Sequence, residues 1–128
     1  MKKLNSCSDL IGMDYVPAAD GENNKIDCIW LVYRVLDLLK VPTPEFNWKW
    51  YDGDDRLIFR SLLQWGKRTT SPYIDGDVLL LPDDNWAFAV VWEGGFLHIH
   101  PTTKKTAWSP LEMTGKCLAF RCSRLNGN

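Results

Sequence analysis

The chain has 128 residues, enough for a single domain (1–128) with a hydrophobic core of its own. Its hydrophobic content of 45% and charged content of 24% are ordinary for a globular protein. The net charge of −1 offers no basic surface for nucleic acid, and no run approaches the roughly 18 apolar residues of a membrane span. We therefore expect neither a nucleic-acid partner nor a membrane span.

In chain order, a polar loop from Pro17 to Asn24 precedes the first predicted helix. Asp27 is well placed as its N-cap, because a short acidic side chain accepts hydrogen bonds from the free amides of a first turn. Apolar residues recur at helical spacing at Cys28, Leu31, Val32, Val35, Leu36 and Leu39. The helix is predicted to end at Val41-Pro42-Thr43-Pro44.

A second helix is predicted around Asp54 to Lys67, with Gly66 and a polar run to Pro72 ending it. Short apolar runs follow, and two of them flank Glu93-Gly94-Gly95, a hairpin signal. These runs predict strands over Val78 to Leu81, Trp86 to Trp92, Phe96 to His100, Thr106 to Ser109 and Lys116 to Cys122. Helices followed by strands predict an α+β fold, with N-terminal helices packed on a roughly five-stranded antiparallel meander sheet.

The four cysteines are expected to carry free thiols. The N-terminal residues lack the apolar stretch of a signal peptide, so we expect the protein to be made in a reducing cytoplasm. Cys117 and Cys122 lie on one predicted strand and point to opposite faces, so they would chelate a metal poorly. We predict no metal site and no cofactor; a cysteine-bound metal module would require at least three sulfurs to converge.

Cys28 falls in the first turn of the first predicted helix, where free amides and the helix dipole favour the nucleophilic thiolate. The alternative is that Cys28 begins the buried face of the helix, because free cysteines are commonly buried. Its position alone leaves both interpretations open.

The motifs around Cys28 follow a recognisable order. Tyr15 precedes Ile26-Asp27-Cys28-Ile29-Trp30-Leu31-Val32, which is followed by Gly76-Asp77-Val78-Leu79-Leu80-Leu81, Asn85-Trp86-Ala87 and Gly95-Phe96-Leu97-His98. From about Gly12 to Arg121 this order resembles the NlpC family of cell-wall cysteine peptidases, and in particular its small members encoded among tailed-phage tail genes. The resemblance implies a papain-like NlpC-type fold.

The resemblance also implies roles for individual residues. Cys28 matches the nucleophile, Tyr15 the loop tyrosine that polarises the scissile carbonyl, and His98 the third, orienting member of the triad. Trp86 occupies the position of the general base, and an indole nitrogen is a donor only, so it cannot accept the thiol proton. Trp30 and Phe88 stand where the family has small residues, and with Trp86 they lead us to expect a filled cleft.

The hairpin register decides whether His98 could replace the missing base. A three-residue loop would place His98 on the sheet face of Trp86, whereas a two-residue loop would place it on the opposite face. A base must come within about 3 Å of the proton that it removes. We expect a structural His98 and a surface-exposed His100.

Two functions from different classes follow. The first is a catalytically inactive NlpC-like structural component of a tailed-phage tail tip or baseplate, made in the host cytoplasm and incorporated into the virion tail. Its expected partners are other tail proteins, with Trp48 and Trp50 as candidate contacts, and peptidoglycan is a candidate ligand. The alternative is an active cysteine peptidase or amidase that cleaves peptidoglycan stem peptides, with Cys28 as nucleophile and His98 as an unusual base.

Overall fold

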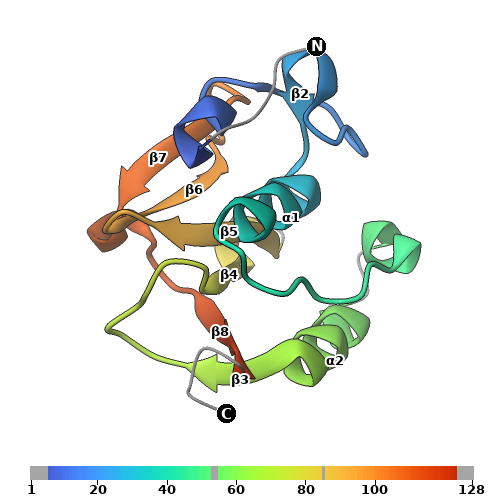
Figure 1. Cartoon of the computed structure of the whole chain (residues 1–128), viewed down its shortest axis with the longest axis vertical. Coiled ribbons are helices and arrows are strands. Elements are labelled where there is room, and N and C mark those ends of the chain that lie inside the picture. The colour runs from blue at the N-terminus through green and yellow to red at the C-terminus, as the bar shows by residue number, and fades with distance from the viewer. Residues whose placement is uncertain (1–5, 53–54, 85, 124–128) are drawn as a thin grey trace.

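The protein folds into helices packed on one face of an antiparallel sheet (Figure 1). The computed structural model describes residues 6–52, 55–84 and 86–123. These residues contain two α-helices, α1 (Cys28–Leu38) and α2 (Asp55–Trp65), together with a six-stranded antiparallel sheet and a small parallel pair, β1 (Asp14–Tyr15) and β2 (Lys25–Ile26). The predicted α+β class is confirmed. Neither of the described helices is long and apolar enough to cross a membrane.

Helix α1 begins at the predicted residue. The Asp27 carboxylate accepts a hydrogen bond of 2.8 Å from the backbone N–H of Trp30, as an N-cap does. The helix ends where Lys40 adopts a left-handed φ of 62° and the N–H of Val41 bonds back to the carbonyl of Leu36. The start predicted for the second helix, Asp54, lies outside the described residues.

The sheet has one strand more than predicted and a different order. Its strands, in spatial order, are β3 (Gly66–Thr69), β8 (Leu118–Cys122), β4 (Val78–Leu81), β5 (Ala87–Trp92), β6 (Gly95–Ile99) and β7 (Thr106–Pro110). Strands β4 to β7 form a meander, but β8 returns to pair between β3 and β4, so the prediction of one continuous meander is wrong. In Figure 1 the last strand accordingly lies beside the strand that follows α2.

The additional strand begins at Gly66, which the sequence marked as the end of a helix. A Cβ at this position would collide with the backbone carbonyl of Arg121 on β8, so only glycine permits the close pairing of the two strands. The rest of β3 is polar, as expected for an edge strand, and its sequence therefore shows no apolar alternation.

Strands β5 and β6 are joined by a two-residue turn. Glu93 and Gly94 have φ values of 53° and 73°, as in the tight turns that match the twist of paired strands. Trp92 therefore pairs with Gly95 and Val90 with Leu97. In this register the side chain of His98 lies on the sheet face opposite to that of Phe88.

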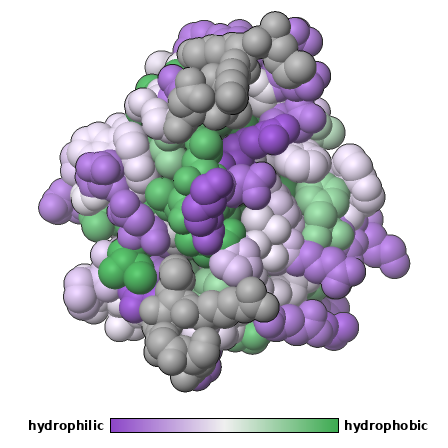
Figure 2. All heavy atoms as spheres, in the orientation of Figure 1, coloured by the Kyte–Doolittle hydropathy of each residue, from purple (hydrophilic) through white to green (hydrophobic). Residues whose placement is uncertain are grey.

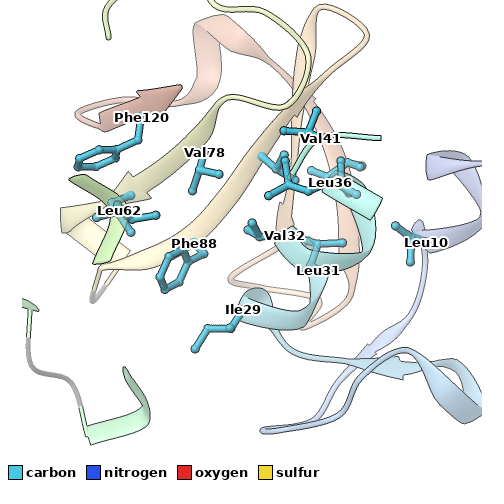
Figure 3. Packing of buried hydrophobic residues seen from close by; sticks show 14 of the residues in the cluster. Leu10, Ile29, Leu31, Val32, Leu36, Val41, Leu62, Val78, Phe88 and Phe120 are labelled. Atoms are coloured by element: carbon cyan, nitrogen blue, oxygen red, sulfur yellow. The ribbon is translucent and has the colours of Figure 1, made fainter. Parts of the chain in front are cut away.

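Both faces of the sheet are covered. Val32 and Leu36 of α1 pack with Val78 and Phe88 in the larger core, which Figure 3 shows between the helix and the strands. A second, smaller core on the other face contains Leu79, Leu81, Ala89, Val91, Phe96 and Ala119. Burial on both faces explains why β4 is continuously apolar instead of alternating. Figure 2 shows hydrophobic residues near the middle of the viewed face, with hydrophilic residues around them.

Candidate functional site

A cavity of about 360 Å³ opens at the N-terminus of α1. It lies where β1, the first turn of α1, the short helix η3 (Trp48–Asp52) and the start of β5 meet. Its lining includes the polar or reactive side chains of Tyr15, Asp27, Cys28, Tyr51, Asp84 and Lys104, and the aromatic rings of Trp50, Trp86 and Phe88. The volume lies within the range of pockets that hold small ligands.

The Cys28 thiol faces this cavity but is held in its protonated form. Burial raises its pKa from the ordinary 9.0 to about 11, and the negative charges of Asp27 and Asp84 act in the same direction. Hydrogen bonds from the backbone N–H of Phe88 and from its own N–H favour the thiolate, but they do not outweigh the loss of solvation. At neutral pH the Cys28 thiol is therefore more fully protonated than that of an ordinary cysteine.

Tyr15 lines the same cavity as Cys28. It is held by hydrogen bonds of the parallel pair β1–β2 and by its N–H, which donates to the carbonyl of Lys104 at 2.8 Å. Burial raises the pKa of its hydroxyl, and so do the thiolate that Cys28 forms at high pH and the charges of Asp27 and Asp84. Its hydroxyl is thus a proton donor at neutral pH.

The position expected for the general base is occupied by the Trp86 side chain, which lines the cavity. Trp86 has a left-handed φ of 61°, and its ring meets that of Phe59 edge-on at a centroid distance of 5.1 Å. Its neighbour in the matching triplet, Asn85, lies outside the described residues. The cavity therefore presents an indole at the residue that the resemblance matched to the general base.

His98 is on the other side of the sheet. It is buried, with 8% of its surface exposed, and its Nε2 lies 2.8 Å from the hydroxyl oxygen of Ser109. Burial lowers its pKa and the neighbouring His100 lowers it further, against an opposing effect of Asp84. The ring is therefore neutral, and the sheet separates it from the sulfur of Cys28.

The expectation of a cleft filled by three aromatic residues is wrong for Trp30. Residues two apart on a helix lie on different faces. Trp30 therefore lies away from the cavity, where its ring stacks on that of Phe46 at a centroid distance of 5.1 Å. Its buried Nε1 finds no hydrogen-bond partner within the described part of the chain. Phe88 is buried and stacks on Trp50 at 5.7 Å, so it forms the floor of a cavity that stays open.

Sequence reasoning missed the pairing of Asp27 with Tyr51. The Asp27 carboxylate accepts hydrogen bonds from the backbone N–H of Ala18 and of Trp30 and from the hydroxyl of Tyr51. Burial raises the pKa of Tyr51, and the bond to Asp27 raises it further. Asp27 was predicted only as a helix cap, and no local pattern signals that a tyrosine 24 residues away shares its carboxylate.

The other predicted contact and ligand residues are dispersed. Trp50 is only 3% exposed and belongs to the core, so its prediction as a partner contact is wrong, whereas Trp48 is 64% exposed. His100 accepts at Nδ1 from the N–H of Thr102 at 3.1 Å and is partly exposed. All four cysteines are free, and no three His, Cys, Asp or Glu side chains among the described residues gather as metal ligands.

Comparisons of the chain with protein-family models, with curated proteins and with solved structures found no match. The function is therefore argued from the cavity and from the sequence motifs.

Proposed function

We propose that the chain is a catalytically inactive protein built on the plan of an NlpC-type cysteine peptidase, and that it serves as a structural component of a tailed-phage tail tip or baseplate. The observation that carries the loss of catalysis is the state of the Cys28 thiol. Its pKa is raised by burial to about 11, and the side chain at the base position is the indole of Trp86.

A cysteine peptidase needs a group that accepts the thiol proton and later protonates the leaving amine. The two histidines of the chain are His98 and His100, and His98 lies across the sheet from Cys28 with its Nε2 hydrogen-bonded to the hydroxyl of Ser109. Loss of a positioned acid–base group costs about 10²- to 10⁴-fold in rate. A protonated thiol without an imidazole to accept its proton supports binding, not turnover.

The tail assignment is supported by the order of the sequence motifs and by one exposed aromatic side chain. Trp48 projects from η3 beside the cavity and stacks on Tyr51 at 5.9 Å. Exposed tryptophans are enriched among the residues that dominate protein interfaces. Neighbouring tail proteins are therefore the proposed partners of this surface.

Incubation with purified peptidoglycan tests the loss of catalysis. The protein and its Cys28→Ala variant should release the same background of stem-peptide fragments. Release by the wild type alone would establish the alternative function, an active peptidase or amidase, which the shared cavity of Cys28 and Tyr15 favours.

Mass spectrometry of purified particles tests the tail assignment separately. Particles of a phage that encodes this chain should contain it in stoichiometric amounts. Its absence from the particles, with expression in the infected cell, would remove the structural role.

A further inference from the structure

The cavity at the N-terminus of α1 combines aromatic walls with negative charge. Tyr15, Tyr51 and Trp86 line it and keep part of their surface exposed, and the buried, stacked rings of Trp50 and Phe88 also belong to its lining. The face of an aromatic ring carries partial negative charge and attracts cations within about 6 Å of its centre. Several rings around one cavity are typical of sites for organic cations.

Two carboxylates determine the sign of the electrostatic field in the cavity. Asp27 is buried and Asp84 is exposed at the rim, and both raise the pKa of Tyr15 and of Cys28. The N-terminus of α1 contributes only about half a positive charge, so the full charge of Asp27 outweighs it. The exposed side chain of Lys104 also borders the cavity, and water screens its positive charge as it screens the negative charge of Asp84. The two exposed charges offset each other, and the buried charge of Asp27 leaves the cavity negative.

The hydrogen bonds of Asp27 decide which kind of cation fits. A carboxylate has about four acceptor sites, and three of those on Asp27 are taken by the N–H of Ala18, the N–H of Trp30 and the hydroxyl of Tyr51. Asp27 can therefore accept from only one of the three N–H donors of a primary ammonium, and the other donors would have to turn from the rings toward Asp84 at the rim. A quaternary ammonium has no N–H donor and loses nothing there.

We propose that this cavity binds a quaternary ammonium group, held by the rings of Tyr15, Tyr51 and Trp86 and by the charges of Asp27 and Asp84. The ligand class is a small trialkylammonium compound or a trimethylated amine side chain. This inference extends the proposed function, because it assigns a ligand to a cavity whose cysteine does not react.

Calorimetric titration of the full chain with choline chloride tests the proposal, with sodium chloride added to keep ionic strength constant. The comparison ligand is 3,3-dimethylbutan-1-ol, which has the same shape without the charge. We expect choline to bind with a Kd of about 1 mM or tighter and the neutral alcohol about tenfold more weakly, a difference of about 1.4 kcal/mol. Ethanolamine, a primary ammonium, should also bind more weakly than choline.

Variants assign the binding to this cavity. Asp84→Asn should weaken choline binding by about threefold to tenfold, whereas Glu112→Gln, an equivalent loss of one exposed charge on η5 (Leu111–Met113), should leave it unchanged. Trp86→Ala should weaken it by about tenfold, with Trp108→Ala on β7 as the matched control. If Trp86→Ala does not fold, Asp84→Asn still tests the proposal, because Asp84 is exposed.

Equal affinities for choline and the neutral alcohol would overturn the proposal, as would no binding of choline at about 10 mM or an Asp84 variant that binds as the wild type does. None of these results would change the titration of Cys28. Failure of this inference is therefore distinguishable from failure of the proposed function.

Discussion

Replacing Trp86 with histidine should return a titrating group to the cavity that contains Cys28. Trp86 lines that cavity, and its left-handed φ of 61° is a conformation in which histidine is enriched among non-glycine residues. The imidazole would face the thiol that the wild-type indole leaves protonated. We expect Trp86→His to raise the thiolate fraction of Cys28 at neutral pH without changing the fold.

The size of the change follows from the coupled titration of the thiol and the imidazole. An imidazolium within about 4 Å of the thiolate contributes about 4 kcal/mol at an effective dielectric constant near 20, which equals about 3 pKa units. Burial raises the pKa of Cys28 to about 11, so the imidazole, with an ordinary pKa near 6.5, loses its proton first and the two groups share one proton over a wide pH range. At pH 7.5 the thiolate–imidazolium pair should therefore raise the thiolate fraction of Cys28 by about a hundredfold over the wild type.

The rate of Cys28 alkylation by iodoacetamide at pH 7.5 measures this change, with mass spectrometry of the peptide that carries Cys28 as the readout. Trp86→Gln is the matched control, because it introduces a polar side chain of similar reach that does not ionise. Its rate should stay at least about tenfold below that of the histidine variant. Equal rates for the two variants would show that position 86 does not face the sulfur, and the assignment of Trp86 to the base position would be wrong.

Three further predictions concern the framework. Arg121→Met should lower the free energy of unfolding by about 3–5 kcal/mol in urea titrations. The guanidinium of Arg121 lies 2.8 Å from the buried carboxylate of Asp77, which the substitution leaves without its counter-charge. A loss below about 1 kcal/mol would contradict this account. Gly66→Ala should cost about 1–3 kcal/mol, because its Cβ would collide with the carbonyl of Arg121, and an unchanged midpoint would argue against the β3–β8 pairing. The lowered pKa of His98 means that the unfolded chain takes up the proton first, so stability should fall as pH drops below about 6.5. His98→Asn should reduce this loss in thermal unfolding between pH 7 and 5, His100→Asn should retain it, and equal profiles for both variants would rule out His98 as the source.

Local patterns predicted the helices well because their signals lie close together in the sequence. Asp27 marks the start of α1, and the apolar spacing from Cys28 onward marks the face that the sheet covers. The hairpin between β5 and β6 was also located correctly. Its loop is two residues long because Gly95 belongs to β6 and pairs with Trp92. A side chain at Gly95 would collide with Trp108 on the neighbouring strand, and the sequence does not show this contact.

The order of the sheet could not be read in the same way. Strand β3 is polar at the edge and pairs with β8, which follows it by about 50 residues, so neither apolar alternation nor a short turn announces the pairing. The register of β6 was left open between two loop lengths, and this choice alone decided the face on which His98 lies.

The cavity was predicted in part. Cys28, Tyr15 and Trp86 were named from the motif order, and all three line it. Tyr51 was missed because it reaches the cavity from η3 through a hydrogen bond to Asp27, and such a contact depends on how segments converge in space.

The rate of Cys28 alkylation by iodoacetamide between pH 6 and pH 11 tests most directly whether this chain retains the chemistry of a cysteine peptidase. Mass spectrometry of the peptide that carries Cys28 separates it from Cys7, which is also buried with a pKa of about 11. A rate that is still rising above about pH 10 is the expected result, since burial holds the thiol protonated. A midpoint at or below about 6.5 would mean an activated thiolate and would contradict the inactive assignment.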